Sequence, residues 1–390
     1  MSQTKNAQKK KGPEPLRFAH PYFTPAPPGR RNLPKVYGQR MTDHVQGTLH
    51  PIPPVRGDST FTLADVIGQT GSDEVAAAGE IIIHIAGDTG VPEGEHETKQ
   101  MMVADAMSKD YNANNPGKSP AFFFHVGDVI YGSAPNSYLD QFYRPYIHYP
   151  GKIVAIPGNH DGETSAKLSD FQTYFCADSQ QVPPMAGSIF RQTVNQPGVY
   201  WCLDAPFVQI IGLYSNSAEN PGFISGPKIG QDQKNWLAKT LKTLKAARDK
   251  GTRKALLFAT HHPPYSSGGH SGSPEMLADI DDACQQAGIM PDAHFSGHAH
   301  SLQHYTRTVP FNGKTLKIPY VVSGCAGHGG QALKLPQKGV NANPVYEFGR
   351  KGWGYCKIVI NKASLAISLY GVVDENTTDL VDGPTTVSLG

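Results

Sequence analysis

Two short apolar runs, each followed by glycine and aspartate, most constrain what this chain can fold into. Residues 81–90 read IIIHIAGDTG, and residues 122–132 read FFFHVGDVIYG. Short runs of β-branched and aromatic residues are typical of buried strands. The Gly-Asp pair after each run predicts a sharp turn at the strand end, which is either ordinary turn chemistry or part of a site.

Similar apolar runs recur along the chain and alternate with segments of helical periodicity. Besides 81–86 and 121–126, the runs that we expect to form strands are 152–156, 208–213 and 255–259. The predicted helices are 98–111 and 230–251, and the end of the chain predicts two strands within 353–373. The apolar stripe of the second helix consists of Trp236, Leu237, Leu241 and Leu244. Strands that alternate with helices indicate a layered α/β fold.

The chain length of 390 residues fits one large α/β domain with an extended arm. Residues 1–70 begin with a basic run and continue rich in proline, so neither a helix nor a central strand is expected there. We predict a partly disordered arm over 1–70, a catalytic domain over 71–375 and a tail over 376–390. Aromatic residues at 18–23 suggest that the arm packs on its own domain or joins a second copy in a homo-oligomer.

The net charge and the cysteines limit which binding partners and which cellular compartment we expect for this protein. A formal net charge of +2 argues against nucleic acid or an anionic membrane as a general partner, and the basic residues 9–11 are typical of a solvated terminus. The five cysteines contain no C-x-x-C pair, which favours reduced structural thiols. Without a membrane-length apolar stretch or a signal-peptide pattern, we expect a cytoplasmic protein, or an exported or periplasmic one if a leader was removed.

Polar side chains that can bind metal follow five of the segments. They are Asp88 after the first run, Asp128 and Tyr131 after the second, Asn159 and His160 after the third, His261, His262 and His270 after the fifth, and His298 and His300 in the later segment MPDAHFSGHAH. Because the carboxyl ends of strands in open α/β sheets border one crevice, these side chains are expected to meet in space.

The residue types in this set match a site for two metal ions. Carboxylate, phenolate, amide oxygen and imidazole are ligands of borderline-hard transition ions, unlike the ligands of calcium or of thiolate zinc sites. Two such ions can clamp the attacking and leaving oxygens of a phosphoryl displacement. Each fragment alone is more often a turn or a packed side chain, so the prediction depends on their joint occurrence in this order.

The ordered blocks GDTG, GDVIY, GNHD, ATHH and GHAH resemble those of the purple acid phosphatases, within the calcineurin-like metallophosphoesterase superfamily. The resemblance covers roughly residues 78–372 and implies a layered αββα sandwich of two mixed β-sheets flanked by helices. The proline-rich residues before Asp88 do not resemble the N-terminal β-sandwich of the large plant-type members. Substrate access is then expected to be shaped by loops of the catalytic domain itself.

The resemblance also implies a role for each site residue. One ion, Fe(III), would be held by Asp88, Tyr131 and His300, with Asp128 bridging to the second ion. The second ion, divalent iron, zinc or manganese, would be held by Asp128, Asn159, His262 and His298. His262 is chosen over His261 because it ends the fourth block. Catalytic roles fall to Asp128, as the bridge, and to His160 and His270, which would bind phosphate and assist the leaving group.

Two linked differences from most of the superfamily, at positions 90 and 131, indicate which subgroup the chain resembles. Most metallophosphoesterases carry Asp-x-His in the first block, but this chain has Gly90 at the histidine position, and Tyr131 would supply the missing ligand. A phenol with a pKa near 10 is deprotonated and bound well only by a strong Lewis acid such as ferric iron. The exchange therefore favours an iron-containing phosphatase over a diesterase.

The resulting hypothesis is a dinuclear acid phosphatase (a phosphoric monoester hydrolase) in which a metal-bound hydroxide attacks a small phosphate monoester. The alternatives are a metallophosphodiesterase or nuclease, a phosphoprotein phosphatase, and a non-catalytic binding module with a relic site. Faster turnover of diesters would favour the first alternative, and a purified protein without metal would favour the last.

Overall fold

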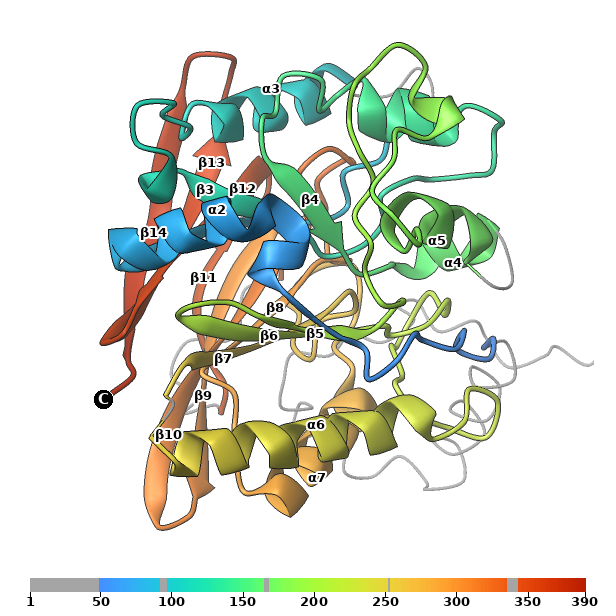
Figure 1. Cartoon of the computed structure of the whole chain (residues 1–390). Helices are drawn as coiled ribbons and strands as arrows, with labels where there is room; N and C mark the ends of the chain where they lie inside the picture. Colours follow the sequence, from blue (N-terminus) through green and yellow to red (C-terminus); the bar gives the residue numbers. More distant parts are fainter. Residues whose placement is uncertain (1–48, 92–96, 165–167, 252, 335–342) are drawn as a thin grey trace, which may run out of the picture.

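The structure is a computed structural model that describes residues 49–91, 97–164, 168–251, 253–334 and 343–390 (Figure 1). Most of the predicted arm, including the basic run 9–11 and the aromatic residues at 18–23, lies outside the described residues. The described part of the predicted arm already contains strand β1 and the start of helix α2, so the layered fold begins before residue 71.

Two mixed β-sheets form the centre of the molecule. The six-stranded sheet has the order β14-β13-β12-β2-β3-β4, with the bounds β14 Thr378–Ser388, β13 Ser364–Val372, β12 Trp353–Asn361, β2 Glu80–Ala86, β3 Pro120–His125 and β4 Lys152–Ala155. The eight-stranded sheet has the order β1-β5-β6-β7-β8-β10-β9-β11, with the bounds β1 Thr60–Thr62, β5 Trp201–Asp204, β6 Val208–Leu213, β7 Ala255–Thr260, β8 Ala293–Ser296, β10 Lys314–Ser323, β9 Leu302–Phe311 and β11 Val345–Arg350. Strands β2, β3 and β4 run parallel to one another, and so do β6, β7, β8 and β10.

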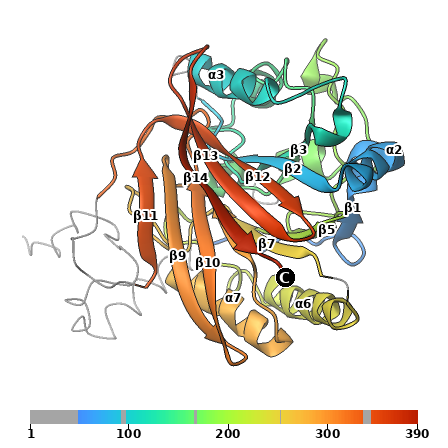
Figure 2. The same cartoon turned by 90° about the vertical axis from the view of Figure 1, so that its left-hand side faces the viewer.

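Helices cover the outer faces of the sheet pair (Figures 1 and 2). The helices are α2 Leu63–Ala78, α3 Glu97–Ser108, α4 Asn159–Thr164, α5 Ser169–Phe175, α6 Asp232–Asp249 and α7 Pro274–Ala287, with short turns at Pro116–Lys118, Leu139–Tyr143 and Pro184–Ala186. Helix α3 packs on the outer face of the six-stranded sheet, and α5 packs beside α4. Helices α6 and α7 pack on the outer face of the eight-stranded sheet.

The core between the sheets explains the apolar runs of the sequence. Side chains of β2 and β3, among them Ile83 and Phe124, meet Leu257 and Phe295 of the opposite sheet in one buried cluster. The alternate residues of the same strands face outward, where Phe123 packs in the cluster that contains α3. Strands buried on both faces read as continuous apolar runs rather than as alternating ones. The predicted α/β sandwich of two mixed sheets flanked by helices is therefore confirmed.

The last strand differs from the sequence expectation. Residues 376–390 were expected to form a tail, but Thr378–Ser388 form β14, which pairs antiparallel with β13 along the edge of the six-stranded sheet. Much of its surface is exposed, and Pro384 lies within it, as edge strands tolerate. The five cysteines are free, and four of them are buried, in agreement with structural thiols.

Candidate metal centre

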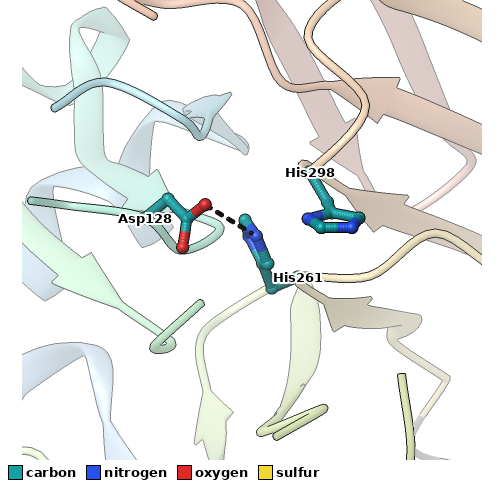
Figure 3. A group of neighbouring side chains, drawn as sticks. All are labelled: Asp128, His261 and His298. Carbon is teal, nitrogen blue, oxygen red and sulfur yellow. Dashed lines mark ion pairs between the residues drawn. The ribbon is translucent and has the colours of Figure 1, made fainter. Parts of the chain in front are cut away.

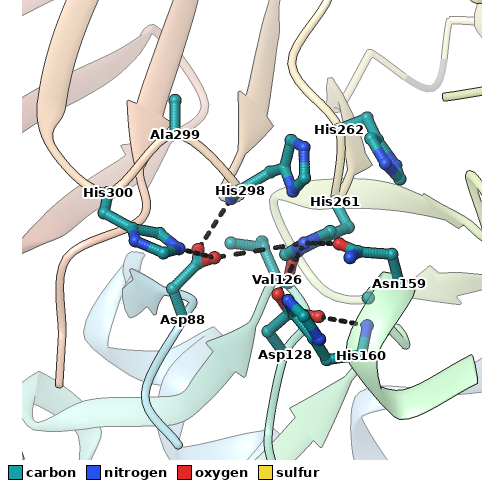
Figure 4. A network of polar contacts seen from close by, with 12 residues as sticks. Asp88, Val126, Asp128, Asn159, His160, His261, His262, His298, Ala299 and His300 are labelled. Carbon is teal, nitrogen blue, oxygen red and sulfur yellow. Dashed lines mark hydrogen bonds and ion pairs between the residues drawn. The ribbon is translucent and has the colours of Figure 1, made fainter. Parts of the chain in front are cut away.

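The polar segments of the sequence gather where the carboxyl ends of parallel strands from both sheets meet (Figure 4). Asp88 follows β2, Asp128 follows β3 and Asn159 follows β4 in one sheet, whereas His261 follows β7 and His298 follows β8 in the other. All five side chains are buried. The fold thus brings together groups that lie more than two hundred positions apart in the sequence.

Asp88, Tyr131 and His300 form the first group of donor atoms. The Tyr131 hydroxyl donates to Asp88 Oδ1 at 3.3 Å and lies 3.4 Å from His300 Nε2. His300 Nε2 is in turn 3.3 Å from Asp88 Oδ1. Three donors at these separations fit the coordination shell of one ion, in which metal-to-ligand bonds to nitrogen and oxygen are about 2.0–2.2 Å.

Asp128, His261 and His298 form a second group beside the first (Figure 3). Each offers one ligand atom, and these atoms all lie within 4.8 Å of one another. His261 Nε2 is 3.2 Å from Asp128 Oδ2 and 3.1 Å from Asn159 Oδ1. The two groups adjoin, because the same nitrogen is 4.0 Å from Asp88 Oδ1. The arrangement therefore offers two neighbouring sets of ligands with Asp128 close to both.

Three of the histidines have one ring nitrogen turned away from the carboxylates. In each of them that nitrogen donates a hydrogen bond to a backbone carbonyl. The pairs are His261 Nδ1 and Val126 O (2.9 Å), His298 Nε2 and Glu219 O (2.8 Å), and His300 Nδ1 and Gly329 O (3.2 Å). A ring N–H that donates to a backbone carbonyl fixes the tautomer and leaves a lone pair on the other nitrogen. This is the pattern expected of metal-binding histidines.

His262 lacks this pattern, although the sequence favoured it as a ligand. Its Nδ1 bonds to Ser215 Oγ at 2.8 Å, and its Nε2 bonds to Ala218 O at 2.7 Å, so both ring nitrogens are already engaged. The side chain points away from Asp128 (Figure 4). The neighbouring His261 faces Asp128 and Asn159 instead, because consecutive residues after a strand point in different directions.

Close packing and strained backbone hold the ligands in place. Asp88 (φ 55°), Asp128 (φ 56°) and His298 (φ 64°) adopt the left-handed conformation, which non-glycine residues rarely adopt. Such residues are found where the surrounding structure enforces a functional geometry. Any side chain at Gly158 would collide with Asp128 Oδ1, and a Cβ at Gly297 would stand 2.5 Å from Asp88 Oδ2.

The buried negative charge of the centre favours the binding of cations. Asp128 Oδ2 is buried, and His261 Nε2 lies 3.2 Å from it. Burial opposes protonation of His261, but Asp128 and Asp88 outweigh it and raise the His261 pKa to about 9, so that a proton supplies positive charge beside the two carboxylates. Burial and then the charges of Asp128 and Asp88 raise the Tyr131 pKa well above its ordinary value. A phenol in this position ionises only beside a strong Lewis acid, so the donor set fits a bound metal ion.

The two predicted catalytic histidines are partly exposed and lie beside the centre. The His160 backbone N–H donates to Asp128 Oδ1 at 3.0 Å, and its Nδ1 lies 2.9 Å from Glu163 Oε2. Burial lowers the His160 pKa, but Asp128 and then Glu163 outweigh it, so the pKa is raised. The His270 ring packs on His298 with ring centroids 4.1 Å apart. Burial, then the charge of His300, lowers the His270 pKa to about 4.

Two further loops contribute groups that the sequence analysis did not identify. The β6 loop, residues 214–222, supplies the partners of His262 and the carbonyl that accepts from His298, and Asn220 Nδ2 lies 3.0 Å from His270 Nδ1. The β10 loop, residues 324–331, supplies Gly329 O and His328. The β6 loop follows the fourth predicted strand and is rich in polar residues (SNSAEN), a signal of the same kind as those used for the other strands.

The fold and the centre define a hydrolase of phosphate esters that uses bound metal. The chain belongs to the calcineurin-like phosphoesterase family, whose model matches residues 81–302. No curated protein matches the chain in a sequence search. Among the described residues, no helix has the length and apolar character needed to span a bilayer.

A comparison with solved structures finds two that are similar to this chain. The first is "GAP50 the anchor in the inner membrane complex of Plasmodium", with a TM-score of 0.53 and 13% identity over 80% of this chain and 88% of that chain. The second is "Structure of PhoD", with a TM-score of 0.46 and 12% identity over 79% of this chain and 72% of that chain. At these identities, the first similarity concerns the fold alone.

Proposed function

We propose that the protein is a dinuclear acid phosphatase of the purple acid phosphatase type that hydrolyses phosphate monoesters. The observation that carries the proposal is the convergence of Tyr131 Oη with Asp88 Oδ1 and His300 Nε2 at 3.3–3.4 Å. A phenol among these donors, combined with glycine at position 90, distinguishes this chain from relatives that carry Asp-x-His in the first block.

The proposed ligand set follows the geometry of the centre. Asp88, Tyr131 and His300 would hold a ferric ion, and Asp128 would contribute to both ions. Asn159, His261 and His298 would hold the divalent ion, with His261 in place of His262. When bound, the ions supply positive charge that binds the phosphate, lowers the pKa of water and stabilises charge that develops on oxygen.

Side chains beside the proposed ions would bind the ester and supply a proton to its leaving group. Hydrolysis forms a bond from a water oxygen to phosphorus and breaks the bond from phosphorus to the ester oxygen, which then needs a proton. His160 would supply it, because Glu163 engages its Nδ1 and leaves Nε2 for the leaving group. His270, held by Asn220, would contact the phosphate oxygens.

The experiment is metal analysis and a visible spectrum of the purified protein, together with hydrolysis of p-nitrophenyl phosphate and bis(p-nitrophenyl) phosphate across pH. We expect two ions per chain, at least one of them iron, a purple or pink colour, and faster turnover of the monoester with an acidic optimum. Faster turnover of the diester would favour a phosphodiesterase or nuclease. A purified protein that neither retains nor binds metal would support a non-catalytic module.

The same preparation tests the phosphoprotein alternative. Phosphoserine and phosphotyrosine peptides should be hydrolysed no faster than small aryl and alkyl phosphates if the physiological substrate is a small molecule. A large preference for a folded phosphoprotein over its own phosphopeptide would instead indicate recognition of a protein surface.

A further inference from the structure

The β10 loop contacts each of the three ligands proposed for the ferric ion. The His328 N–H donates to Asp88 O at 2.9 Å. The Gly329 carbonyl accepts from His300 Nδ1 at 3.2 Å, and Gln331 N–H donates to His300 O at 2.9 Å. Backbone bonds thus tie the loop to Asp88 and to His300.

The contact of this loop with Tyr131 comes from a side chain. The His328 ring lies flat on the phenol ring of Tyr131, with ring centroids 4.2 Å apart and an interplanar angle of 14°. The same imidazole meets the His300 ring with centroids 4.6 Å apart, at an angle of 68°. A ring in this place therefore restricts both the tilt of the phenol and the position of its oxygen relative to His300.

The loop packs closely against the centre on both sides of His328. A Cβ at Gly327 would collide with Thr89 O, and a Cβ at Gly324 would stand 2.7 Å from Asp88 Oδ2. Trp353 Nε1 donates to Gly327 O at 3.2 Å and closes the loop from the outside. This close packing of the backbone supports the position of the His328 ring on Tyr131.

We infer that His328 is a positioning residue for Tyr131: by stacking on the phenol, it sets the geometry with which the phenolate meets the metal. The inference rests on the proposed function, because it takes Tyr131 as a ligand. A stacked ring constrains the orientation of its partner and contributes attraction beyond the area that it buries. Groups around a ligand are known to tune metal affinity and electronic properties in this way.

The test compares the wild-type protein, purified with iron bound, with the variants His328→Ala and His328→Phe. The readouts are the visible absorption band, the iron content, and the rate at which a chelator removes iron. We expect His328→Ala to keep its fold by circular dichroism, to shift the maximum of the band, and to hold iron roughly two- to tenfold more weakly, the range that one aromatic contact represents. His328→Phe should keep most of the wild-type band position and iron affinity, because it keeps a stacked ring.

A matched control is His148→Ala, which removes an exposed histidine (side chain 70% exposed) and should leave the band unchanged. An unchanged band and iron affinity in His328→Ala would overturn the inference and leave the proposed function intact. So would a His328→Phe protein that behaves like the alanine variant. If His328→Ala does not fold, His328→Gln replaces it with the same expectations. A colourless wild-type protein that holds two ions, iron among them, would overturn the proposed ferric phenolate and this inference with it.

Discussion

Gly90 lies against Gln141 so closely that a Cβ at position 90 would stand 2.8 Å from Gln141 Oε1. That oxygen accepts the backbone N–H of Tyr131 at 2.9 Å, and Gln141 Nε2 donates to the Tyr131 carbonyl at 2.9 Å. The same Cβ would stand 2.7 Å from Val129 O. A side chain at position 90 would therefore displace the amide that holds the Tyr131 backbone. Glycine at 90 and the position of the Tyr131 phenol are in this way sterically linked.

Gly90→Ala should displace the Tyr131 segment, because the contacts at 2.7–2.8 Å involve backbone atoms and a hydrogen-bonded amide. We expect loss of the visible band and metal affinity lower by roughly 10–100-fold, the usual cost of disturbing the support of a ligand. Metal analysis and the absorption spectrum of the purified variant measure both effects.

Gly230→Ala serves as the control for this substitution. Its φ of 81° makes alanine unfavourable there, but no atom would lie within 4 Å of the new Cβ. It should cost about 1–2 kcal/mol of stability and leave the spectrum unchanged. If Gly90→Ala keeps both the colour and the iron of the wild type, the steric argument is wrong.

The adjacent histidines of β7 allow a direct test of the ligand assignment. His261→Ala should lose the divalent ion, because it removes the nitrogen that faces Asp128 and Asn159 at 3.1–3.2 Å. His262→Ala should retain a second ion with affinity lower by about 10–100-fold, because it removes only a ring that supports His298 and the β6 loop. Titration of each variant with zinc against a competing chelator measures the difference, and the reverse ranking would make His262 the ligand.

This pair also shows how far the sequence could predict the centre. The blocks correctly indicated which strand ends meet, because the carboxyl ends of parallel strands share an edge. They could not separate His261 from His262, because that choice depends on which of two consecutive side chains points inward. The proposal of His261 rests on the partners of His262, Ser215 Oγ and Ala218 O, which belong to a loop 47 and 44 residues earlier.

Elements with weak patterns were missed for related reasons. Strand β14 contains Gly383-Pro384 and polar residues, because an edge strand needs no continuous apolar run. His328 stands alone in a glycine-rich segment, and nothing in its neighbours indicates a ring stacked on Tyr131. Its role depends on a contact across nearly two hundred residues, which local patterns do not contain.

Removal of metal should destabilise the protein, because the buried carboxylates of Asp88 and Asp128 would lose their counter-charge. An ion present at a thousand times its dissociation constant contributes about 4 kcal/mol to the free energy of unfolding. We expect a lower melting temperature after exhaustive chelation, recovered by adding back iron and zinc. An unchanged melting temperature would argue against a tightly bound centre.

Asp128→Asn should abolish phosphatase activity and lower the melting temperature of the metal-free protein. The substitution removes a carboxylate that lies 3.2 Å from His261 Nε2 and accepts the His160 N–H at 3.0 Å. Burial alone would raise the Asp128 pKa, but His261 and His160 outweigh it and hold the pKa below its ordinary value, so the ionised carboxylate stabilises the folded protein at neutral pH. Calorimetry of both metal-free proteins measures the effect, and a higher melting temperature in the variant would contradict it.

The pH dependence of stability should report the titration of a buried histidine, His294, that is not one of the proposed metal ligands. His294 lies on Tyr320 with ring centroids 5.3 Å apart, and its Nε2 contacts Thr260 Oγ1 at 2.9 Å. Burial, and then the charge of Arg307, lowers its pKa to about 3. Because the unfolded chain, with a histidine pKa of about 6.5, binds the proton more readily, stability is lost as the pH falls from 6.5 toward 3.

At pH 5 this one histidine should cost about 2 kcal/mol of unfolding free energy relative to pH 7. His294→Gln keeps an N–H donor for Thr260 and cannot titrate, so its urea denaturation should lose about 2 kcal/mol less than the wild type between the two pH values. Both proteins are compared with chelator present, so that metal release does not contribute, and His148→Gln is the exposed control. Equal losses in the wild type and His294→Gln would show that His294 is not held neutral by burial.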